Sequence, residues 1–429
     1  MPPRLADRRE IAVLKQVSRR LLPFLFLLYI VAYLDRINVG FAFLQMRTQL
    51  GFTDEVYGLG AGLFFAGYFL FQLPSNLILI RVGARRWIAG LMVVWGLVSA
   101  SMIFVRTPHG FYLLRFLLGA AEAGFFPGMV LYLKSWFPAK ARARAMAWFM
   151  TAGPISGVVG GPVSGALLGM RHIGLQGWQW LFIMEGAPAI MLGGVVLLYL
   201  TERPSLAAWL EAGDRAWLVE VLESESRHNA AQGRARFSAG FRSGTIWLLV
   251  LVYFGLNMCA YGMMLWLPSV IQSLAGFSNF EIGVLTAIPN LAAAIMMVLV
   301  GRHSDRSGER RWHIALSAFG GAFGLVLTAY THSPIPVLVG TSLAIGGAFC
   351  MDGPFWALPT SLLSGAAAAA GVAVINSLGN LGGFFGPATL GWVRSHTGGF
   401  RGGLLVIAAA LSVSGCIALL VRTHGAGRE

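Results

Sequence analysis

Charged side chains are scarce in this sequence, and their scarcity argues against a soluble globular protein. Only 12% of the 429 residues are Asp, Glu, Lys or Arg, whereas 56% are hydrophobic and the mean hydropathy is +0.69. Soluble domains usually carry about a quarter of their residues as charged side chains. The composition therefore predicts a polytopic membrane protein.

Cysteine and recognisable catalytic motifs are also scarce. The three cysteines, Cys259, Cys350 and Cys416, fall inside apolar stretches and form no CxxC pair, so we expect neither a disulfide framework nor a thiolate metal site. No HExxH, GxSxG or P-loop pattern is present. We therefore expect no enzyme, no metal and no cofactor other than a coupling ion. A membrane-embedded enzyme or sensor is the least favoured alternative.

Twelve apolar stretches occupy most of the chain, and each is long enough to cross a bilayer as a helix at about 1.5 Å per residue. They predict an all-α membrane protein with a lead segment (1–20), a six-helix bundle (21–200), a central polar loop with amphipathic helices (201–245), a second six-helix bundle (246–421) and a tail (422–429). The stretches are approximately 21–43, 58–80, 87–105, 110–133, 143–168, 178–200, 246–272, 281–301, 312–331, 334–363, 367–394 and 401–421.

Positive charge exceeds negative charge, with 32 Lys and Arg against 18 Asp and Glu, a balance that also occurs in nucleic-acid-binding proteins. The bases form no patch. Of the 32, 25 lie in the two chain ends and the alternate loops on the same side of the membrane, five lie in the remaining loops, and Arg36 and Arg115 lie inside apolar stretches. This distribution predicts that both termini are cytoplasmic and that the protein binds no nucleic acid.

Four charged residues interrupt the first and fourth apolar stretches: Asp35, Arg36, Arg115 and Glu122. A charge in the bilayer centre costs at least roughly 2.5 to 3.5 kcal/mol, so such residues need a polar interior and partners. Arg115 and Glu122 are two helical turns apart and share one face. Two acids and two bases predict an electroneutral cluster that joins the two helices. The alternatives are independent structural salt bridges, or a first helix that ends before the charged pair.

None of the eight histidines lies at the middle of a predicted span. Protons that cross the membrane would therefore have to use carboxyl groups, whose charged form is disfavoured by burial.

An internal repeat appears at an offset of 225 residues. Segment 81–87 aligns with 306–312, and Gly161-Pro162 aligns with Gly386-Pro387. Because six helices separate equivalent points, the two halves have the same orientation, as in transporters built from parallel repeats. The second half lacks the four charges of the first, and its polar candidates are Tyr261, Trp266, Asp352, Trp356, Asn376 and Asn380.

Several motifs resemble a known family. GRHSDRSGERR (301–311) resembles the loop signature of the major facilitator superfamily, and segment 76–86 resembles its degenerate first-half copy, with Ile80 in place of the usual acid. YLDRINVGFA, RFLLGAAEAGFFPG, GWQWLFIMEG and GPFWALPTSLLSG together resemble the anion:cation symporter branch, which includes tartrate, phthalate, hexuronate and galactonate transporters. The resemblance covers Leu21 to Val421.

This resemblance implies a rocker-switch fold and proton-driven uptake of a small organic anion. The first, fourth, seventh and tenth spans would line a central cavity. By the same resemblance Asp35 and Glu122 are proton-coupling sites, Arg36 anchors the substrate carboxylate, and Arg115 is the charge partner of Asp35. The other substrate-site residues would be Tyr33, Tyr68, Trp356 and Asn376, and the gating loop would use Gly301, Asp305, Arg306, Gly308 and Arg310.

The remaining expectations concern setting and substrate. We expect a monomer in the lipid bilayer of the bacterial inner membrane. The substrate stays open among hydroxy-dicarboxylates such as tartrate, sugar acids and aromatic acids, and the roles of Asp352 and Glu185 stay open as well. A drug/proton antiporter is the nearest alternative function, because the fifth span contains the Gly-Pro-rich run GPISGVVGGPVSGALL.

Overall fold

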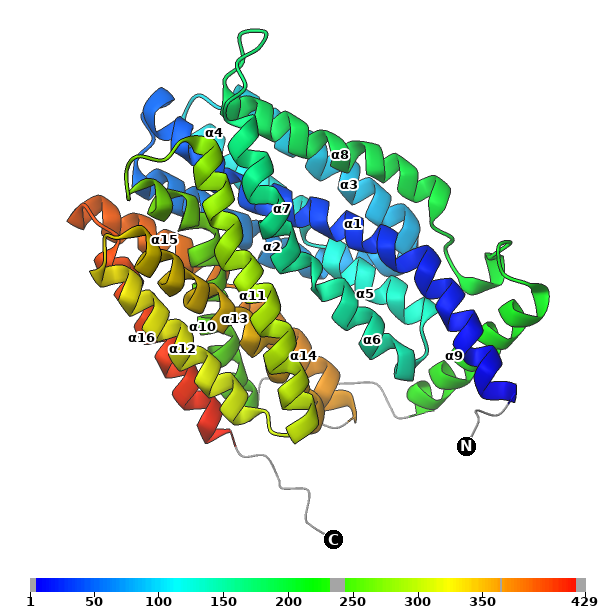
Figure 1. The fold of residues 1–429 in the computed structure, drawn as a ribbon. Coiled ribbons are helices and arrows are strands. Elements are labelled where there is room, and N and C mark those ends of the chain that lie inside the picture. The colour runs from blue at the N-terminus through cyan, green and yellow to red at the C-terminus, as the bar shows by residue number, and fades with distance from the viewer. Residues whose placement is uncertain (1–4, 232–243, 363–364, 422–429) are drawn as a thin grey trace.

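The computed structural model describes residues 5–231, 244–362 and 365–421, and these residues are mostly helical (Figure 1). Within those ranges, the β-type pairing consists of one isolated bridge between His172 and Leu175. The predicted all-α fold is confirmed. Two groups of helices lie side by side, one formed before α9 and one after it (Figure 1).

The first half contains six membrane crossings. The first three are α1 (Leu5–Gln49), α2 (Asp54–Val82) and α3 (Ala84–Ser101), the last extended by the 3₁₀ turn η1 (Met102–Phe104). The fourth consists of α4 (Pro108–Glu122) and α5 (Phe125–Trp136), the fifth of α6 (Ala139–Met150) and α7 (Ala152–Leu167), and the sixth is α8 (Gly177–Tyr199). A 3₁₀ turn, η2 (Pro204–Leu206), and α9 (Ala212–Ala231) follow.

The second half repeats this order. Its crossings are α10 (Gly244–Gln272), α11 (Asn279–Ser307), α12 (Arg311–Tyr330), α13 (Pro334–Leu362), α14 (Gly365–Gly379) with α15 (Gly382–Thr397), and α16 (Arg401–Leu420). Local sequence sets the ends of α11: Ser278 and Glu281 form a capping box at its start, and Gly308 ends it with a φ of +68°.

Ten helical segments of the described chain are long and apolar enough to cross a membrane. The fifth and eleventh crossings are not among these ten; like the fourth, each is divided between two helices, at Thr151 and after Gly379 respectively. Together they make the twelve predicted crossings. The lipid-facing side is visible on α11, where Leu291, Ile295 and Leu299 are all more than half exposed at a spacing of four residues.

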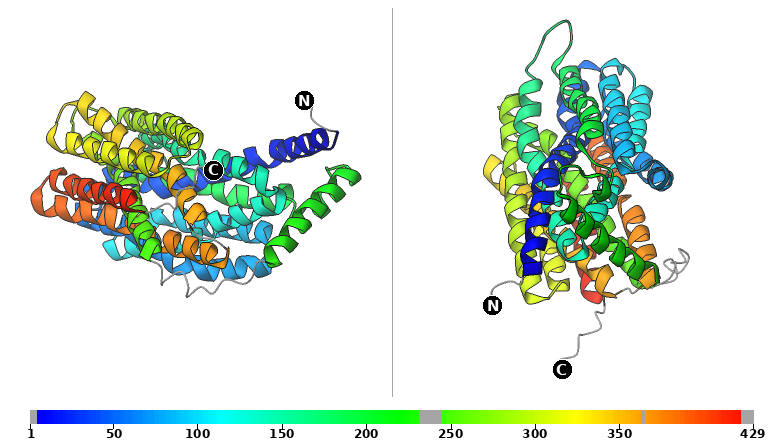
Figure 2. Two further views of the ribbon diagram at one scale, coloured as in Figure 1. Left: turned by 90° about the horizontal axis from the view of Figure 1, so that it is seen from below. Right: turned by 90° about the vertical axis from the view of Figure 1, so that its right-hand side faces the viewer.

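Helix α1 differs from the expected division between a lead segment and a first span, because one uninterrupted helix contains both. Its basic beginning projects from the bundle together with α9 (Figure 2). The Nε atom of Arg9 lies 2.8 Å from Oδ1 of Asp214, and α9 also holds the first half through an ion pair of 3.0 Å between Glu225 and Arg142. The central segment is therefore anchored to the first half.

The two halves meet through glycines at positions related by the repeat. A Cβ atom on Gly58 of α2 would lie 2.9 Å from Cα of Gly391 on α15. A Cβ atom on Gly165 of α7 would lie 3.1 Å from Cα of Gly283 on α11. Gly58 and Gly283 are 225 residues apart and are therefore equivalent positions of the repeat. Gly58, in the first half, packs against the eleventh crossing, and Gly283, in the second half, packs against the fifth crossing. This is the arrangement expected of parallel repeats around a two-fold axis.

Candidate functional site

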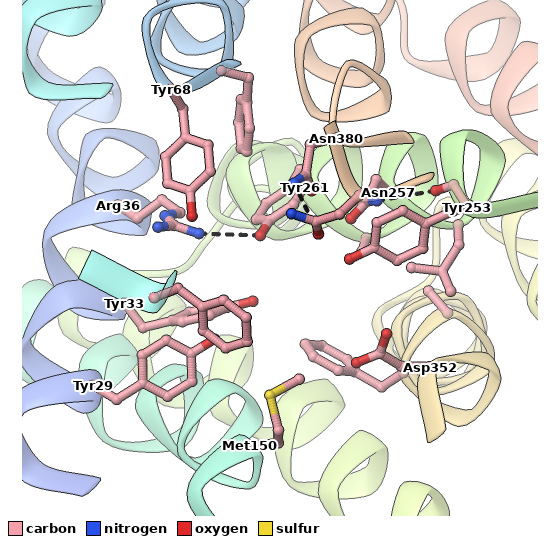
Figure 3. A pocket seen from close by; sticks show the side chains of 17 residues that line it. Tyr29, Tyr33, Arg36, Tyr68, Met150, Tyr253, Asn257, Tyr261, Asp352 and Asn380 are labelled. Atoms are coloured by element: carbon pink, nitrogen blue, oxygen red, sulfur yellow. Dashed lines mark hydrogen bonds between the residues drawn. The ribbon is translucent and has the colours of Figure 1, made fainter. Parts of the chain in front are cut away.

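A cavity lies at the centre of the molecule between the two halves (Figure 3). The empty space within its walls and its opening to solvent together amount to about 760 Å³. Helices α1, α2, α5 and α6 line it from the first half, and α10, α13 and the α14–α15 region line it from the second. The lining residues are Tyr29, Tyr33, Arg36, Phe65, Tyr68, Phe126, Met150, Tyr253, Leu256, Asn257, Ala260, Tyr261, Ala348, Phe349, Asp352, Asn376 and Asn380.

The first half contributes a cationic and aromatic wall. Tyr29, Tyr33 and Arg36 are spaced by four and three residues and therefore share one face of α1. Tyr68 reaches the same place from α2, with its hydroxyl directed toward Arg36 (Figure 3). The guanidinium carbon of Arg36 lies 5.5 Å from the ring centroid of Tyr33 and 5.3 Å from that of Tyr68. These cation–π contacts hold the charged group in a fixed orientation at the cavity wall.

Arg36 also has a buried counter-ion. Its Nη2 and Nε donate to Oε2 of Glu122 at 2.9 and 3.3 Å, and its Nη1 donates to the hydroxyl of Tyr261 at 3.2 Å. The first contact ties α1 to α4 as predicted. Arg36 and Tyr261 are separated by the repeat offset, so equivalent positions of the two halves meet at the centre. The guanidinium presents planar donors to the cavity, and among the residues that the structure describes Glu122 is the one acid that forms an ion pair with it.

The second half contributes amides, hydroxyls and one acid. Tyr253, Asn257 and Tyr261 recur every four residues on α10, and Nδ2 of Asn257 donates to the carbonyl of Gly379 at 3.3 Å. Asp352 stands across the cavity from Arg36 (Figure 3). Among the lining residues Arg36 is the one base and Asp352 the one acid. The cavity is thus polarised between its two walls.

The structure places four of the five predicted substrate residues on the cavity wall: Arg36, Tyr33, Tyr68 and Asn376. Trp356 is not among the lining residues. Its ring lies 5.0 Å from that of Tyr253, centroid to centroid, and Tyr253 takes the position on the wall. The sequence-based prediction missed Tyr29, Tyr253 and Asn257, although their four-residue spacing from Tyr33 and Tyr261 could have identified them.

The predicted ion pair between Arg115 and Asp35 is not formed. Oδ1 of Asp35 instead accepts hydrogen bonds from Ser99 and from Nδ2 of Asn38, at 3.1 Å for the latter. Arg115 is fully buried, packs 5.0 Å from the ring of Phe64, and has no hydrogen-bond partner among the described residues. It remains near enough to Glu122 and Asp35 for their charges to interact. Arg36 is directed to the cavity side of α1 and Asp35 to the opposite side, because neighbouring helical residues point about 100° apart.

The predicted gating loop surrounds the end of α11. Nη1 of Arg310 lies 2.6 Å from Oδ1 of Asp305 and 2.9 Å from Oγ of Ser304. Gly308 supplies the left-handed turn that folds the loop back, whereas Gly301 and Arg306 lie on the helix itself. In the first-half copy, Ile80 is mostly exposed and offers no equivalent of Asp305.

A second connection between the halves lies at the opposite end from the chain termini. Asp54, at the start of α2, lies 3.3 Å from Nη1 of Arg394 on α15 and 3.5 Å from Nη2 of Arg47 on α1. Nearby, the hydroxyl of Tyr57 donates to the carbonyl of Leu265 at 2.6 Å. These contacts join the two halves at that end, and the sequence-based prediction did not identify them. No group of three or more His, Cys, Asp or Glu side chains in the described part of the chain could hold a metal ion.

The sequence of this chain is similar to those of known transporters. The model of the family described as Major Facilitator Superfamily matches residues 25–387. An Agrobacterium vitis protein named "Putative tartrate transporter" is 49% identical over 415 residues, covering 96% of this chain and 95% of that protein. An Acinetobacter baumannii protein named "Quinolone resistance transporter" is 39% identical over 401 residues, covering 93% of this chain and 92% of that protein.

A solved structure also shares the fold. The inward-open form of the xylose transporter XylE from E. coli superposes with a TM-score of 0.76, covering 95% of this chain and 97% of that chain. The sequence identity is 15%, so this similarity concerns the fold alone.

Proposed function

Because the chain belongs to the major facilitator superfamily, a family of membrane transporters and not of enzymes, we propose that it imports a small organic carboxylate together with a proton. The carriage of a tartrate-like hydroxy-dicarboxylate is supported by the name of the Agrobacterium vitis relative. Sugar acids and aromatic acids remain candidates because the cavity offers both hydrogen-bonding and aromatic side chains.

The position of Arg36 carries this proposal. It is the one base among the cavity-lining residues, and aromatic rings and Glu122 hold its guanidinium in place. A guanidinium stays charged at every physiological pH and binds a carboxylate through two parallel hydrogen bonds. Tyr68 and Tyr261 lie beside it and would bind the oxygen atoms next to that carboxylate.

Coupling follows from the contact between Arg36 and Glu122. When ionised, Glu122 occupies the donors that a substrate carboxylate needs. A proton on Glu122 would remove that competition, so proton binding would favour substrate binding and the reverse would hold equally. Asp35 is the second proposed proton site. Apart from the proton, no cofactor enters this mechanism.

In alternating access, the cavity would be closed at one end at a time, and each transport step would open the closed end and close the other. The ion pairs of Asp54 close the end opposite to the termini. The excess of Lys and Arg at the termini and in the loops beside them supports a cytoplasmic location for the end that carries the termini. The described conformation would then be closed toward the outside. We place the protein in the bacterial inner membrane, as a monomer.

Uptake into proteoliposomes tests the proposal. Purified protein is reconstituted and supplied with labelled tartrate, a sugar acid or an aromatic acid, with and without an inwardly directed proton gradient. The expected result is accumulation of one class above its external concentration, and only while the gradient lasts. Accumulation of none of the three, or accumulation indifferent to the gradient, would contradict it. A melting-shift screen with the same acids measures binding independently.

A drug/proton antiporter is the second candidate. The relative named "Quinolone resistance transporter" and the acid Asp352 on the cavity wall both favour it, because an acid suits substrates with a cationic group. The two functions differ in the direction in which a proton gradient drives the substrate. An antiporter would expel its substrate when protons enter, whereas the proposed symporter would accumulate it.

A further inference from the structure

A second polar cluster lies on the side of α1 that faces away from the cavity. Asp35 belongs to it, with Oδ1 bound by the hydroxyl of Ser99 on α3 and by Nδ2 of Asn38, one turn further along α1. All three side chains are fully buried. This cluster shares no residue with the cavity lining.

Glu185 of α8 enters the same cluster. Its Oε1 accepts a hydrogen bond of 2.7 Å from the hydroxyl of Ser164 on α7, and Asn38 lies near its carboxyl group without a hydrogen bond between them. Close packing of α3 on α8 fixes this arrangement, since a Cβ atom on Gly186 would lie 3.0 Å from the carbonyl oxygen of Gly96. Asn38 therefore stands between two buried carboxyl groups, Asp35 and Glu185.

Three buried oxygens of this cluster lack a hydrogen-bond donor: Oδ2 of Asp35, Oε2 of Glu185 and Oδ1 of Asn38. All three are acceptors, so each needs a hydrogen-bond donor, which a proton on a carboxyl group can supply. Other charged groups do not meet this need. Arg115 and Glu122 reach Asp35 from α4 electrostatically, but among the described residues no basic side chain forms an ion pair with Glu185 or Asp35. Arg115 offsets the charge of Asp35 without forming an ion pair with it, so two ionised carboxylates in this cluster would leave a charge buried without a counter-ion, which is strongly unfavourable.

We propose that Glu185 and Asp35, with Asn38 between them, form a proton-binding site separate from the substrate cavity, and that Glu185 is a third proton-carrying carboxyl of this protein. A proton on Oε2 of Glu185 or Oδ2 of Asp35 provides one of the missing donors and leaves at most one negative charge in the cluster. The site's role in transport rests on the proposed proton coupling. Because α1 carries Asp35 into this cluster and the adjacent Arg36 into the cavity, the proton is held one residue from the substrate anchor.

Infrared spectroscopy of the purified protein tests proton binding directly. A protonated carboxyl group has a carbonyl stretching band that a carboxylate lacks. At neutral pH, Glu185→Gln should remove or shift part of this band, and Asp35→Asn should alter what remains. Glu225→Gln, an acid-to-amide control on α9 outside the bundle, should leave the band unchanged. An unchanged band in Glu185→Gln would overturn the proposal.

Two further measurements test the proposal independently of the Glu185→Gln variant. If Glu185→Gln does not fold, Ser164→Ala removes the hydrogen bond to Oε1 alone and should shift the carbonyl band without abolishing it; no shift would overturn the proposal. Replacing potassium by sodium at constant ionic strength should leave the band intact. Loss of the band in sodium would identify a metal-cation site in place of a proton site.

Transport assays separate this inference from the proposed function. Glu185→Gln should weaken proton-driven accumulation several-fold and change its pH profile. If the parent protein never responds to a proton gradient while the infrared band depends on Glu185, the proposed function fails and the proton site stands. If the parent accumulates substrate in response to a proton gradient while the infrared band does not change in Glu185→Gln, the proposed proton site is wrong and the proposed function stands.

Discussion

Replacement of Glu122 by Gln removes the negative charge that holds Arg36 while preserving the shape of the side chain. Arg36 donates to Oε2 of Glu122 at 2.9 and 3.3 Å, and a hydrogen bond to a charged group contributes roughly 1.5 to 3 kcal/mol. A substrate carboxylate must displace this acceptor. Where Glu122 of the parent is ionised, the variant should therefore bind substrate roughly 10- to 150-fold more tightly, since 1.4 kcal/mol is a factor of ten.

Binding and transport should respond differently to this substitution. In the parent, affinity should fall as pH rises and Glu122 loses its proton, whereas the affinity of Glu122→Gln should be nearly independent of pH. In proteoliposomes the variant should keep counterflow exchange but lose accumulation driven by a pH gradient, because it imitates the protonated carrier permanently. Glu225→Gln is the matched control and should behave as the parent does in every assay.

Retained pH-driven accumulation in Glu122→Gln would refute the coupling mechanism. Loss of counterflow together with accumulation would refute it as well, since that result assigns Glu122 to the structure of the bundle. If the affinity of the variant for substrate still falls as the pH rises, the charge that competes with the substrate belongs to another group.

Three further predictions address the anchor, the seal and the topology. Arg36→Lys should weaken substrate binding about 10-fold or more, because an ammonium cannot reproduce the planar pair of donors; calorimetric affinity within a few fold of the parent would reject Arg36 as the anchor. Asp54→Asn should loosen the contact between the halves. A cysteine introduced at Thr286 should then react several-fold faster with an impermeant maleimide. An unchanged rate would show that the ion pairs of Asp54 do not hold the halves together. Cysteines at Ser307 and Ser333 should label from opposite sides of the membrane, and labelling from one side would overturn the topology.

The sequence by itself determined the class of protein and much of its architecture. Twelve apolar stretches have only helical solutions in a bilayer, because every backbone polar group must be satisfied within the segment. The offset of 225 residues then related the halves, since repeats of six helices keep the same orientation. Arg36 and Glu122 were found for the same reason, because a charge in an apolar stretch is too costly without a function or a partner.

Only the tertiary structure decided which charges face one another. Asp35 and Arg36 are neighbours in the chain, but the helix directs one toward α3 and α8 and the other into the cavity. The sequence therefore could not show that Glu122 pairs with Arg36 while Asp35 turns to Asn38 and Ser99. It also could not place Trp356 behind Tyr253, or Asp54 against Arg394. Side-chain pairs between helices depend on how each helix is rotated and packed, and no pattern along one chain segment contains that rotation.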